Sequence, residues 1–142
     1  MLSEVFGDRI QCIEKADDWK EAVAIVIRPL IDQGYAEERY LKAIYENVNK
    51  YGDYFVLMPG FALPHARPEE GSLKTGMSLL KLNESVRFSN GEKAKLLVGL
   101  AAADASSHLD TLAELTEFLM DDNKMTLLYD AKNPKEIKEI LS

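Results

Sequence analysis

The chain has 142 residues, a formal net charge of −7 and 46% hydrophobic residues. This length predicts one folded domain, residues 1–142, because the chain is long enough for a genuine core and too short for two independent domains. The negative charge argues against nucleic acid and anionic membrane surfaces as partners, because both require concentrated lysine and arginine, and it suits docking to a basic protein surface.

The sequence contains neither a membrane span nor a secretion signal. No apolar run approaches the roughly 18 residues needed to cross a bilayer, and the N-terminus lacks a basic segment followed by an apolar one. We therefore expect a cytoplasmic location with no direct membrane insertion. The single cysteine, Cys12, has no partner for a disulfide or a zinc site and is expected to be a buried, small apolar residue.

The first part of the chain predicts a strand followed by a helix. Residues 9–15 alternate apolar and polar side chains, which indicates a short strand. Asp17 and Asp18 are expected to cap the helix, and Glu21 has the spacing of a capping box with Asp18. Residues 22–27 are apolar on every side, which is typical of a buried helix.

Pro29 and Gly34 are expected to end that helix. Pro29 lacks a backbone donor and should kink or stop the helix early, and Gly34 suits its C-terminal end. A second helix is predicted over residues 37–50, with an apolar stripe made of Leu41, Ile44, Tyr45 and Val48.

The middle of the chain predicts strands around a loop. Residues 54–57 form a strand that leads into the loop, and residues 69–71 form a turn whose two carboxylates are expected to be solvated. A further strand is predicted over residues 75–82, a turn at residues 83–84, and an edge strand or an extension at residues 86–88.

The last third of the chain predicts a central strand followed by helices. Residues 94–103 form a nearly continuous apolar run, typical of a strand covered on both faces. A helix is expected to begin at Ser106 or Ser107, with an inner face of Leu109, Leu112, Ala113, Leu115 and Leu119. Residues 125–129 suit a strand or a helix, and Pro134 suits the first position of a last helix.

Helices and strands thus alternate along the chain, which predicts an α/β fold. We expect a three-layer sandwich with a mixed β-sheet of about five strands flanked by helices. Ligand sites in such sheets lie beyond the ends of strands, and both histidines of the chain, His65 and His108, fall there.

His65 lies in a segment that is poorly suited to a core residue. Pro64 pushes Leu63 into an extended conformation, and Pro68 restricts the chain again after Arg67. We therefore expect the imidazole to be held in a defined position by a stiff loop, with a cation two residues away.

His108 lies near the start of a helix that follows the most buried strand. The free N–H groups and the macrodipole make such a helix start an anion site. If the two histidines meet, a neutral His65 could attack a phosphoryl group, while Arg67, His108 and the amides of residues 106–108 balance the charge. The alternative is two unrelated surface or capping histidines.

Two blocks of sequence carry a resemblance to a known family. Residues 60–68, GFALPHARP, followed by residues 99–109, GLAAADASSHL, resemble the enzyme IIA domain of the mannitol/fructose class (type 2) in the bacterial phosphoenolpyruvate-dependent sugar phosphotransferase system. The resemblance extends over essentially the whole chain. Residues 54–60 and 64–71 are most similar to the ascorbate-type branch.

The resemblance implies a role for each of these residues. In that family, the histidine after the proline accepts a phosphoryl group from the histidine-containing phosphocarrier protein HPr and passes it to a cysteine of enzyme IIB. His65 would be the phosphorylated residue and His108 a supporting one, in a phosphotransferase that drives uptake of a sugar, here L-ascorbate. Mannitol-type members carry an arginine at the phosphate where Asn47 aligns, which leaves Arg67 as a candidate for the missing cation.

The resemblance also implies the partners. No cysteine follows that could serve as the enzyme IIB acceptor, so enzyme IIB and the membrane component IIC are expected to be separate chains. Phe61, Leu63 and Leu109 lie near the histidines and could form an apolar docking collar, or could belong to the core.

Three other functions are alternatives to transport. A regulatory module of the same fold would use its phosphorylation state to control a partner. A metal site made of both histidines with Asp104 or Asp110 is disfavoured, because no metal-binding motif is present, and we expect no cofactor. A serine hydrolase is disfavoured because Ser106 and Ser107 suit helix caps and no G-x-S-x-G motif exists.

Overall fold

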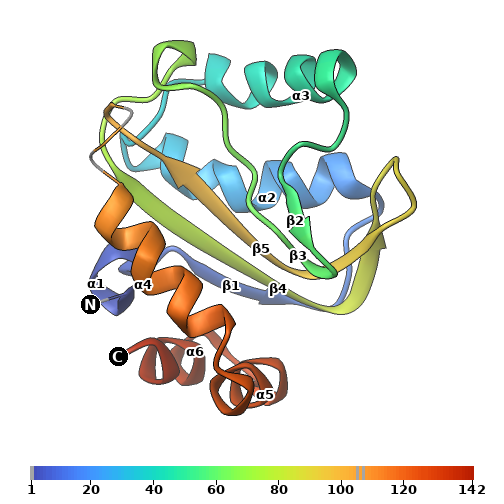
Figure 1. Cartoon of the computed structure of the whole chain (residues 1–142), viewed down its shortest axis with the longest axis vertical. Helices are drawn as coiled ribbons and strands as arrows, with labels where there is room; N and C mark the ends of the chain where they lie inside the picture. The colour runs from blue at the N-terminus through green and yellow to red at the C-terminus, as the bar shows by residue number, and fades with distance from the viewer. Residues whose placement is uncertain (1, 105, 107) are drawn as a thin grey trace.

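A five-stranded mixed sheet lies between two layers of helices, as the computed structural model shows for residues 2–104, 106 and 108–142 (Figure 1). The predicted three-layer α/β architecture is therefore confirmed. The strand order is β1-β4-β5-β3-β2. The strands are β1 (Ile10–Ile13), β2 (Val56–Met58), β3 (Gly60–Ala62), β4 (Gly76–Arg87) and β5 (Lys93–Ala101), and the helices are α1 (Leu2–Phe6), α2 (Trp19–Asp32), α3 (Arg39–Tyr51), α4 (Leu109–Leu119), α5 (Asp122–Asp130) and α6 (Pro134–Leu141).

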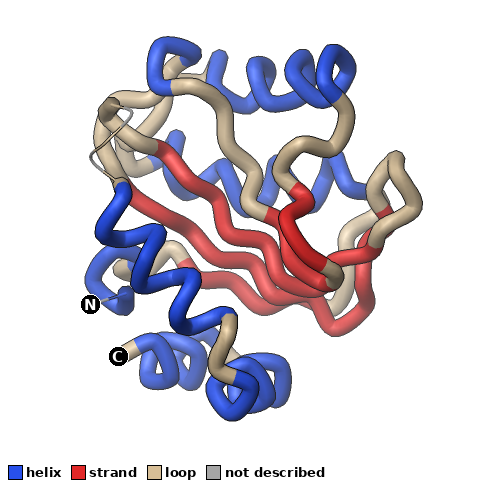
Figure 2. Tube along the Cα trace, viewed as in Figure 1, coloured by secondary structure: helices blue, strands red, loops and turns tan. Residues whose placement is uncertain are grey.

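Each face of the sheet has its own hydrophobic core. Helices α2 and α3 cover one face, and α1, α4, α5 and α6 cover the other (Figure 2). Ile27 and Ile44 are fully buried in the first core, and Phe6 and Ile137 in the second. Because both faces are covered, the middle strands are apolar along almost their whole length.

Strand β5 has the central position that its apolar run predicts. It pairs antiparallel with β4 on one side and parallel with β3 on the other. Parallel strands end at the same edge of a sheet, so the segments that leave Ala62 of β3 and Ala101 of β5 emerge close together. This pairing brings two distant parts of the sequence to one edge.

The predicted early end of α2 at Pro29 is wrong, because the helix continues to Asp32. Proline cannot donate to the carbonyl four residues earlier, that of Ile25. Instead, the side chain of Gln11 on β1 donates a hydrogen bond to this carbonyl, with Nε2 to O at 2.9 Å. The helix tolerates proline because a neighbouring strand supplies the missing donor.

Other features of α2 agree only in part with expectation. Asp18 caps the helix by accepting a bond from the Glu21 amide at 2.9 Å, but the Glu21 carboxylate accepts from the amide of Asp17 and not from that of Asp18. The expected burial on every side is wrong, because Ala24 and Ile25 are only half-buried. Helix α3 forms with the predicted apolar stripe toward the core.

Two predicted strand boundaries are wrong. The segment after α3 forms a short antiparallel pair, β2 and β3, instead of one strand. The turn expected at residues 83–84 is absent, since β4 runs through them with a shift of register between Lys81 and Val86. Asn83 donates to the Glu14 carboxylate, which keeps this part of β4 beside the end of β1.

The C-terminal part is helical throughout, so residues 125–129 belong to a helix, α5. Helix α6 begins at Pro134 as predicted. Helix α4 begins at Leu109, later than expected, and the capping role predicted for Ser107 lies outside the described residues. The predicted inner face of α4 is partly wrong, because Leu109 is 58% exposed and Ala113 is also exposed.

Two smaller differences lie near the N-terminus. Helix α1 was not predicted from the sequence, yet it places Leu2 and Phe6 in the second core. Cys12 is half-buried rather than buried, and its partial burial raises the pKa of the thiol.

Candidate active site

The loop that carries His65 is held by hydrogen bonds at nearly every step. After β3, the Leu63 amide donates to Phe55 O at 2.8 Å, and Pro64 O accepts from the Leu100 amide of β5 at 3.1 Å. The loop is thus tied on one side to the segment before β2 and on the other to the central strand. This agrees with the prediction that His65 is positioned by a stiff loop.

Tyr40 of α3 holds the next step of the loop. Its buried hydroxyl donates to Leu100 O at 2.7 Å and accepts from the Ala66 amide at 3.0 Å. Burial raises the pKa of Tyr40 to about 12, so the hydroxyl keeps its proton at physiological pH. Helix α3, the loop and β5 therefore meet at one side chain.

The imidazole of His65 has one ring nitrogen engaged. Nδ1 lies 2.5 Å from the carbonyl oxygen of Leu63. A carbonyl oxygen can only accept, so Nδ1 carries the proton of the neutral ring and Nε2 keeps its lone pair. The Tyr54 hydroxyl donates to the His65 carbonyl, and the two rings meet edge to face at 5.3 Å between centroids.

The neutral form of His65 is favoured by its surroundings. Burial lowers the pKa of the imidazole, and the nearby His108 lowers it further, while the bond to the Leu63 carbonyl acts in the opposite direction. Burial disfavours the charged form because the low-polarity interior solvates an imidazolium less well than water does. The surroundings of His65 therefore favour a neutral imidazole over an imidazolium.

The two histidines line one pocket of about 430 Å³, as the strand-end argument predicts. His108 comes directly before α4, at the N-cap position, without a capping hydrogen bond from its side chain. Its buried Nδ1 has no hydrogen-bond partner among the residues that the structure describes. The lining residues are Tyr40, Asn47, Tyr51, Tyr54, His65, Ala66, Arg67, Pro68, Leu100, Ala102 and His108.

Arg67 and Asn47 also reach this pocket. Of the described residues that line it, Arg67 alone has a permanently charged cationic side chain, and this residue is exposed. Asn47 donates from Nδ2 to Glu70 Oε1 at 3.1 Å, and the Arg67 amide donates to the same oxygen at 3.0 Å. The prediction that the carboxylates of residues 69–71 are merely solvated is therefore wrong for Glu70.

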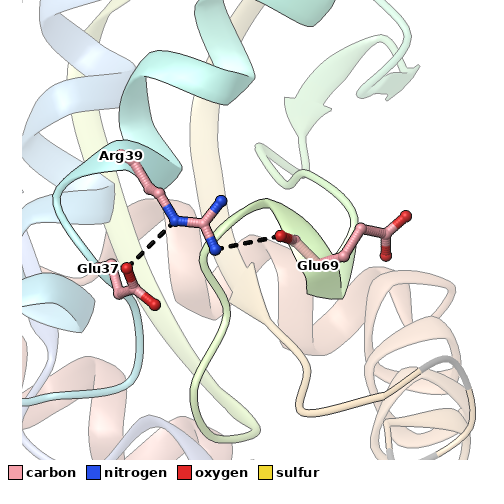
Figure 3. Close-up of polar contacts among 3 residues, drawn as sticks. All are labelled: Glu37, Arg39 and Glu69. Carbon is pink, nitrogen blue, oxygen red and sulfur yellow. Dashed lines mark hydrogen bonds and ion pairs between the residues drawn. The ribbon is translucent and has the colours of Figure 1, made fainter.

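The turn after Arg67 is anchored to the start of α3. Arg39 bonds to Glu37 Oε2 at 3.1 Å and donates to Glu69 O at 3.2 Å, as Figure 3 shows. Gly71 closes this turn with φ of +126°, and a Cβ there would lie 3.2 Å from the Tyr40 amide nitrogen. Only glycine suits this backbone and this close approach.

Of the two alternatives for the apolar residues near the histidines, a docking collar or the core, the core applies to two of the three. Phe61 and Leu63 are only 2% and 6% exposed, because they belong to the core between the sheet and α4. Leu109 is exposed next to His108 and remains available for contact with a partner.

Two tyrosines of the site were missed from the sequence. Tyr40 could have been found, because it continues the buried series Ile44 and Val48 at a spacing of four. Tyr54 carries no such signal, since its partner is the backbone carbonyl of a residue eleven positions away.

No group of three or more His, Cys, Asp or Glu side chains among the described residues is arranged to hold a metal ion. None of the helices in the described part of the chain has the length and apolar character to cross a bilayer.

Comparison with known proteins agrees with this geometry. Over 143 aligned residues the chain is 43% identical to the mannitol-specific cryptic phosphotransferase enzyme IIA component of Escherichia coli, and the alignment covers 99% of this chain and 97% of the relative. It is 33% identical over 143 residues to the ascorbate-specific PTS system EIIA component of E. coli, with 99% of this chain and 92% of the relative covered.

Solved structures show the same relationship. A PTS IIA protein from Streptococcus mutans matches with a TM-score of 0.91 and 35% identity, over 99% of this chain and 92% of the other. The complex of E. coli enzyme IIA and phosphorylated enzyme IIB of the mannitol system matches with a TM-score of 0.80 and 27% identity, over 95% and 94%.

The family model described as "Phosphoenolpyruvate-dependent sugar phosphotransferase system, EIIA 2" matches residues 5–142, which is almost the whole chain. The paired histidines at the strand ends therefore occur in a protein that belongs to the EIIA type 2 family of the phosphoenolpyruvate-dependent sugar phosphotransferase system.

Proposed function

We propose that the protein is a phosphocarrier that accepts a phosphoryl group on His65 from HPr and passes it to a cysteine of a separate enzyme IIB. The observation that carries this proposal is the state of the His65 ring. Nδ1 is bound to the Leu63 carbonyl, so Nε2 is the nitrogen with a free lone pair. Burial lowers the pKa of the imidazole, which keeps that lone pair available.

The transfer would proceed as a displacement at phosphorus. Nε2 of His65 forms a bond to phosphorus while the bond to the donor nitrogen breaks, and the donor imidazole takes back the electron pair. The proton on Nδ1 stays on His65 and remains bonded to Leu63 O, which stabilises the positive charge that develops on the ring. Enzyme IIB reverses these roles when its cysteine sulfur attacks the phosphoryl group on His65.

Phosphoryl transfer depends mainly on positioning and charge balance, and the pocket supplies groups for both. The exposed Arg67 side chain lies at the pocket and can reach the transferred oxygens. His108 presents a buried ring nitrogen that has no partner in the described structure. We assign both a supporting role, with Arg67 in place of the arginine that mannitol-type members carry where this chain has Asn47.

The partners follow from the family and from one solved relative. The E. coli mannitol enzyme IIA binds phosphorylated enzyme IIB as a complex, which supports a separate IIB partner for this chain. We propose that the membrane component IIC acts downstream and that this protein works in the cytoplasm. The sugar that we propose is L-ascorbate, and mannitol is the second candidate because the cryptic mannitol component is 43% identical to the chain.

The first experiment is phosphorylation in a reconstituted system. Incubation with phosphoenolpyruvate, enzyme I and HPr should add one acid-labile phosphoryl group, which intact mass measurement and peptide mapping should place on His65. His65→Ala should abolish this gain while keeping a native circular dichroism spectrum. His108→Ala should slow the gain without abolishing it.

Two outcomes would contradict the proposal. Labelling of folded His65→Ala to the wild-type extent would show that another residue accepts the phosphoryl group. If wild-type protein becomes phosphorylated but neither ascorbate-type nor mannitol-type enzyme IIB takes the group, the transport role fails and a regulatory role replaces it.

A further inference from the structure

Tyr54 contacts His65 through both its hydroxyl and its ring. The hydroxyl donates a hydrogen bond to the His65 carbonyl oxygen. The ring meets the imidazole edge to face, with 5.3 Å between centroids and 77° between planes. The half-buried Tyr54 lies just before β2 and lines the same pocket as His65.

The His65 carbonyl belongs to a stretch of the loop in which hydrogen bonds fix both the backbone and the imidazole. The Leu63 carbonyl accepts a hydrogen bond from the imidazole Nδ1 of His65, and the Ala66 amide donates a hydrogen bond to the Tyr40 hydroxyl. The His65 carbonyl and the Ala66 amide belong to the same peptide group, which is therefore bonded at both ends, by Tyr54 at the oxygen and by Tyr40 at the N–H. Loss of the bond at the oxygen would let this peptide tilt and let the backbone of His65 shift, which would disturb the short contact between Nδ1 and Leu63 O.

Tyr54 also has a neighbour on the other side of the pocket. Burial raises the pKa of the Tyr54 hydroxyl, so that it keeps the proton it donates, and Asn47 of α3 is a side-chain neighbour of the hydroxyl. Asn47 donates to Glu70, which also accepts from the Arg67 amide. Tyr54 thus lies next to the hydrogen bonds that hold the turn after Arg67.

We propose that Tyr54 is a positioning residue for phosphoryl transfer, whose hydroxyl fixes the His65 peptide so that the imidazole keeps its Nδ1–H tautomer with Nε2 directed into the pocket. This inference rests on the proposed phosphocarrier function. Tyr54 does not contact the phosphoryl group in this mechanism. It acts through the backbone of His65 and through the contact between the two rings.

The test is Tyr54→Phe, which removes the hydroxyl and keeps the ring. In wild-type protein, ¹⁵N NMR of the imidazole should show one neutral tautomer at His65, protonated on Nδ1. In Tyr54→Phe, the signals should shift toward a mixture of tautomers. The rate constant for phosphoryl transfer from HPr should fall about tenfold, with little change in KM, because the hydroxyl bonds the backbone of His65 and makes no contact with HPr in this mechanism.

Tyr45→Phe is the matched control. Tyr45 lies on α3, and its hydroxyl donates to Lys20 O at 2.6 Å, outside the pocket. This variant also removes one tyrosine-to-carbonyl hydrogen bond, and it should leave both the His65 tautomer and the transfer rate at wild-type values. Asn47→Ala, which removes a side-chain neighbour of the Tyr54 hydroxyl, should shift the tautomer in the same direction by a smaller amount.

The two measurements separate this inference from the proposed function. If wild-type protein is not phosphorylated at all, the function fails, while the NMR arm still decides whether Tyr54 fixes the ring. An unchanged tautomer and transfer rate in Tyr54→Phe would overturn the positioning role. An equal loss of rate in Tyr45→Phe would also overturn it, because the effect would then be one of general stability.

Discussion

Gln11→Met is expected to destabilise the protein by leaving the Ile25 carbonyl of α2 without a partner. Pro29 has no N–H to bond this carbonyl, and Gln11 Nε2 donates to it from β1 at 2.9 Å. Methionine keeps the length of the glutamine side chain, so the substitution removes the donor with little change of volume.

The size of the effect follows from the burial of the bond. An unsatisfied buried carbonyl costs about 1–3 kcal/mol, and the half-buried position of Ile25 gives water partial access, so we expect about 1 kcal/mol. For a chain of this size, that loss corresponds to a Tm lower by about 2–4 °C. Urea denaturation followed by circular dichroism measures the free energy of unfolding directly.

A double-mutant cycle with Pro29→Ala decides whether the reasoning is right. Pro29→Ala restores the backbone donor to the Ile25 carbonyl, so Gln11→Met should cost much less in that background, with a coupling of about 1 kcal/mol. Pro134→Ala is the control background, because Pro134 occupies the first position of α6 and frees no carbonyl. An equal cost of Gln11→Met in all three backgrounds would refute the compensation.

Three further predictions concern the site. Tyr40→Phe removes the hydroxyl shared by Leu100 O and the Ala66 amide, so the free energy of unfolding should fall by about 2 kcal/mol, and an unchanged urea midpoint would contradict this. Arg67→Ala should slow single-turnover phosphoryl transfer about tenfold and Arg67→Lys should retain most of the rate, whereas equal rates in all three proteins would remove Arg67 from the mechanism. Because burial lowers the pKa of His65 below its ordinary value of 6.5, the ring stays unprotonated to lower pH, and the transfer rate should fall only below pH 6.5; a titration midpoint of His65 above 6.5 would contradict the assigned environment.

Much of the fold could be predicted because its signals are local. The apolar run that becomes β5 predicts a strand buried on both faces, and β5 lies in the middle of a sheet that has helices on both faces. The cap at Asp18 and the start of α6 at Pro134 depend on residues within one helical turn. The same is true of the stiff loop around His65, where Pro64 restricts its immediate neighbours.

The predictions that failed depend on distant partners. Pro29 would stop an isolated helix, but Gln11 lies eighteen residues earlier on a strand that packs beside α2. The turn expected at residues 83–84 is replaced by continuous strand because Glu14 offers both a backbone carbonyl and a carboxylate there. A prediction from neighbouring residues does not include a hydrogen-bond donor or acceptor that only the tertiary fold places next to the segment.

The sequence by itself determined that His65 lies in a stiff loop, that His108 lies near a helix start, and that an α/β sheet carries both beyond its strand ends. Only the tertiary structure decided how His65 presents its ring. Parallel pairing of β3 with β5 brings the two histidines into one pocket. The bond from Nδ1 to Leu63 O makes Nε2 the ring nitrogen that keeps its lone pair, and Tyr54 holds the His65 carbonyl. The reason is physical, because the tautomer and the orientation of the ring are set by hydrogen bonds to backbone groups. Every residue has a backbone carbonyl, so the residue types do not indicate which carbonyl will accept the bond.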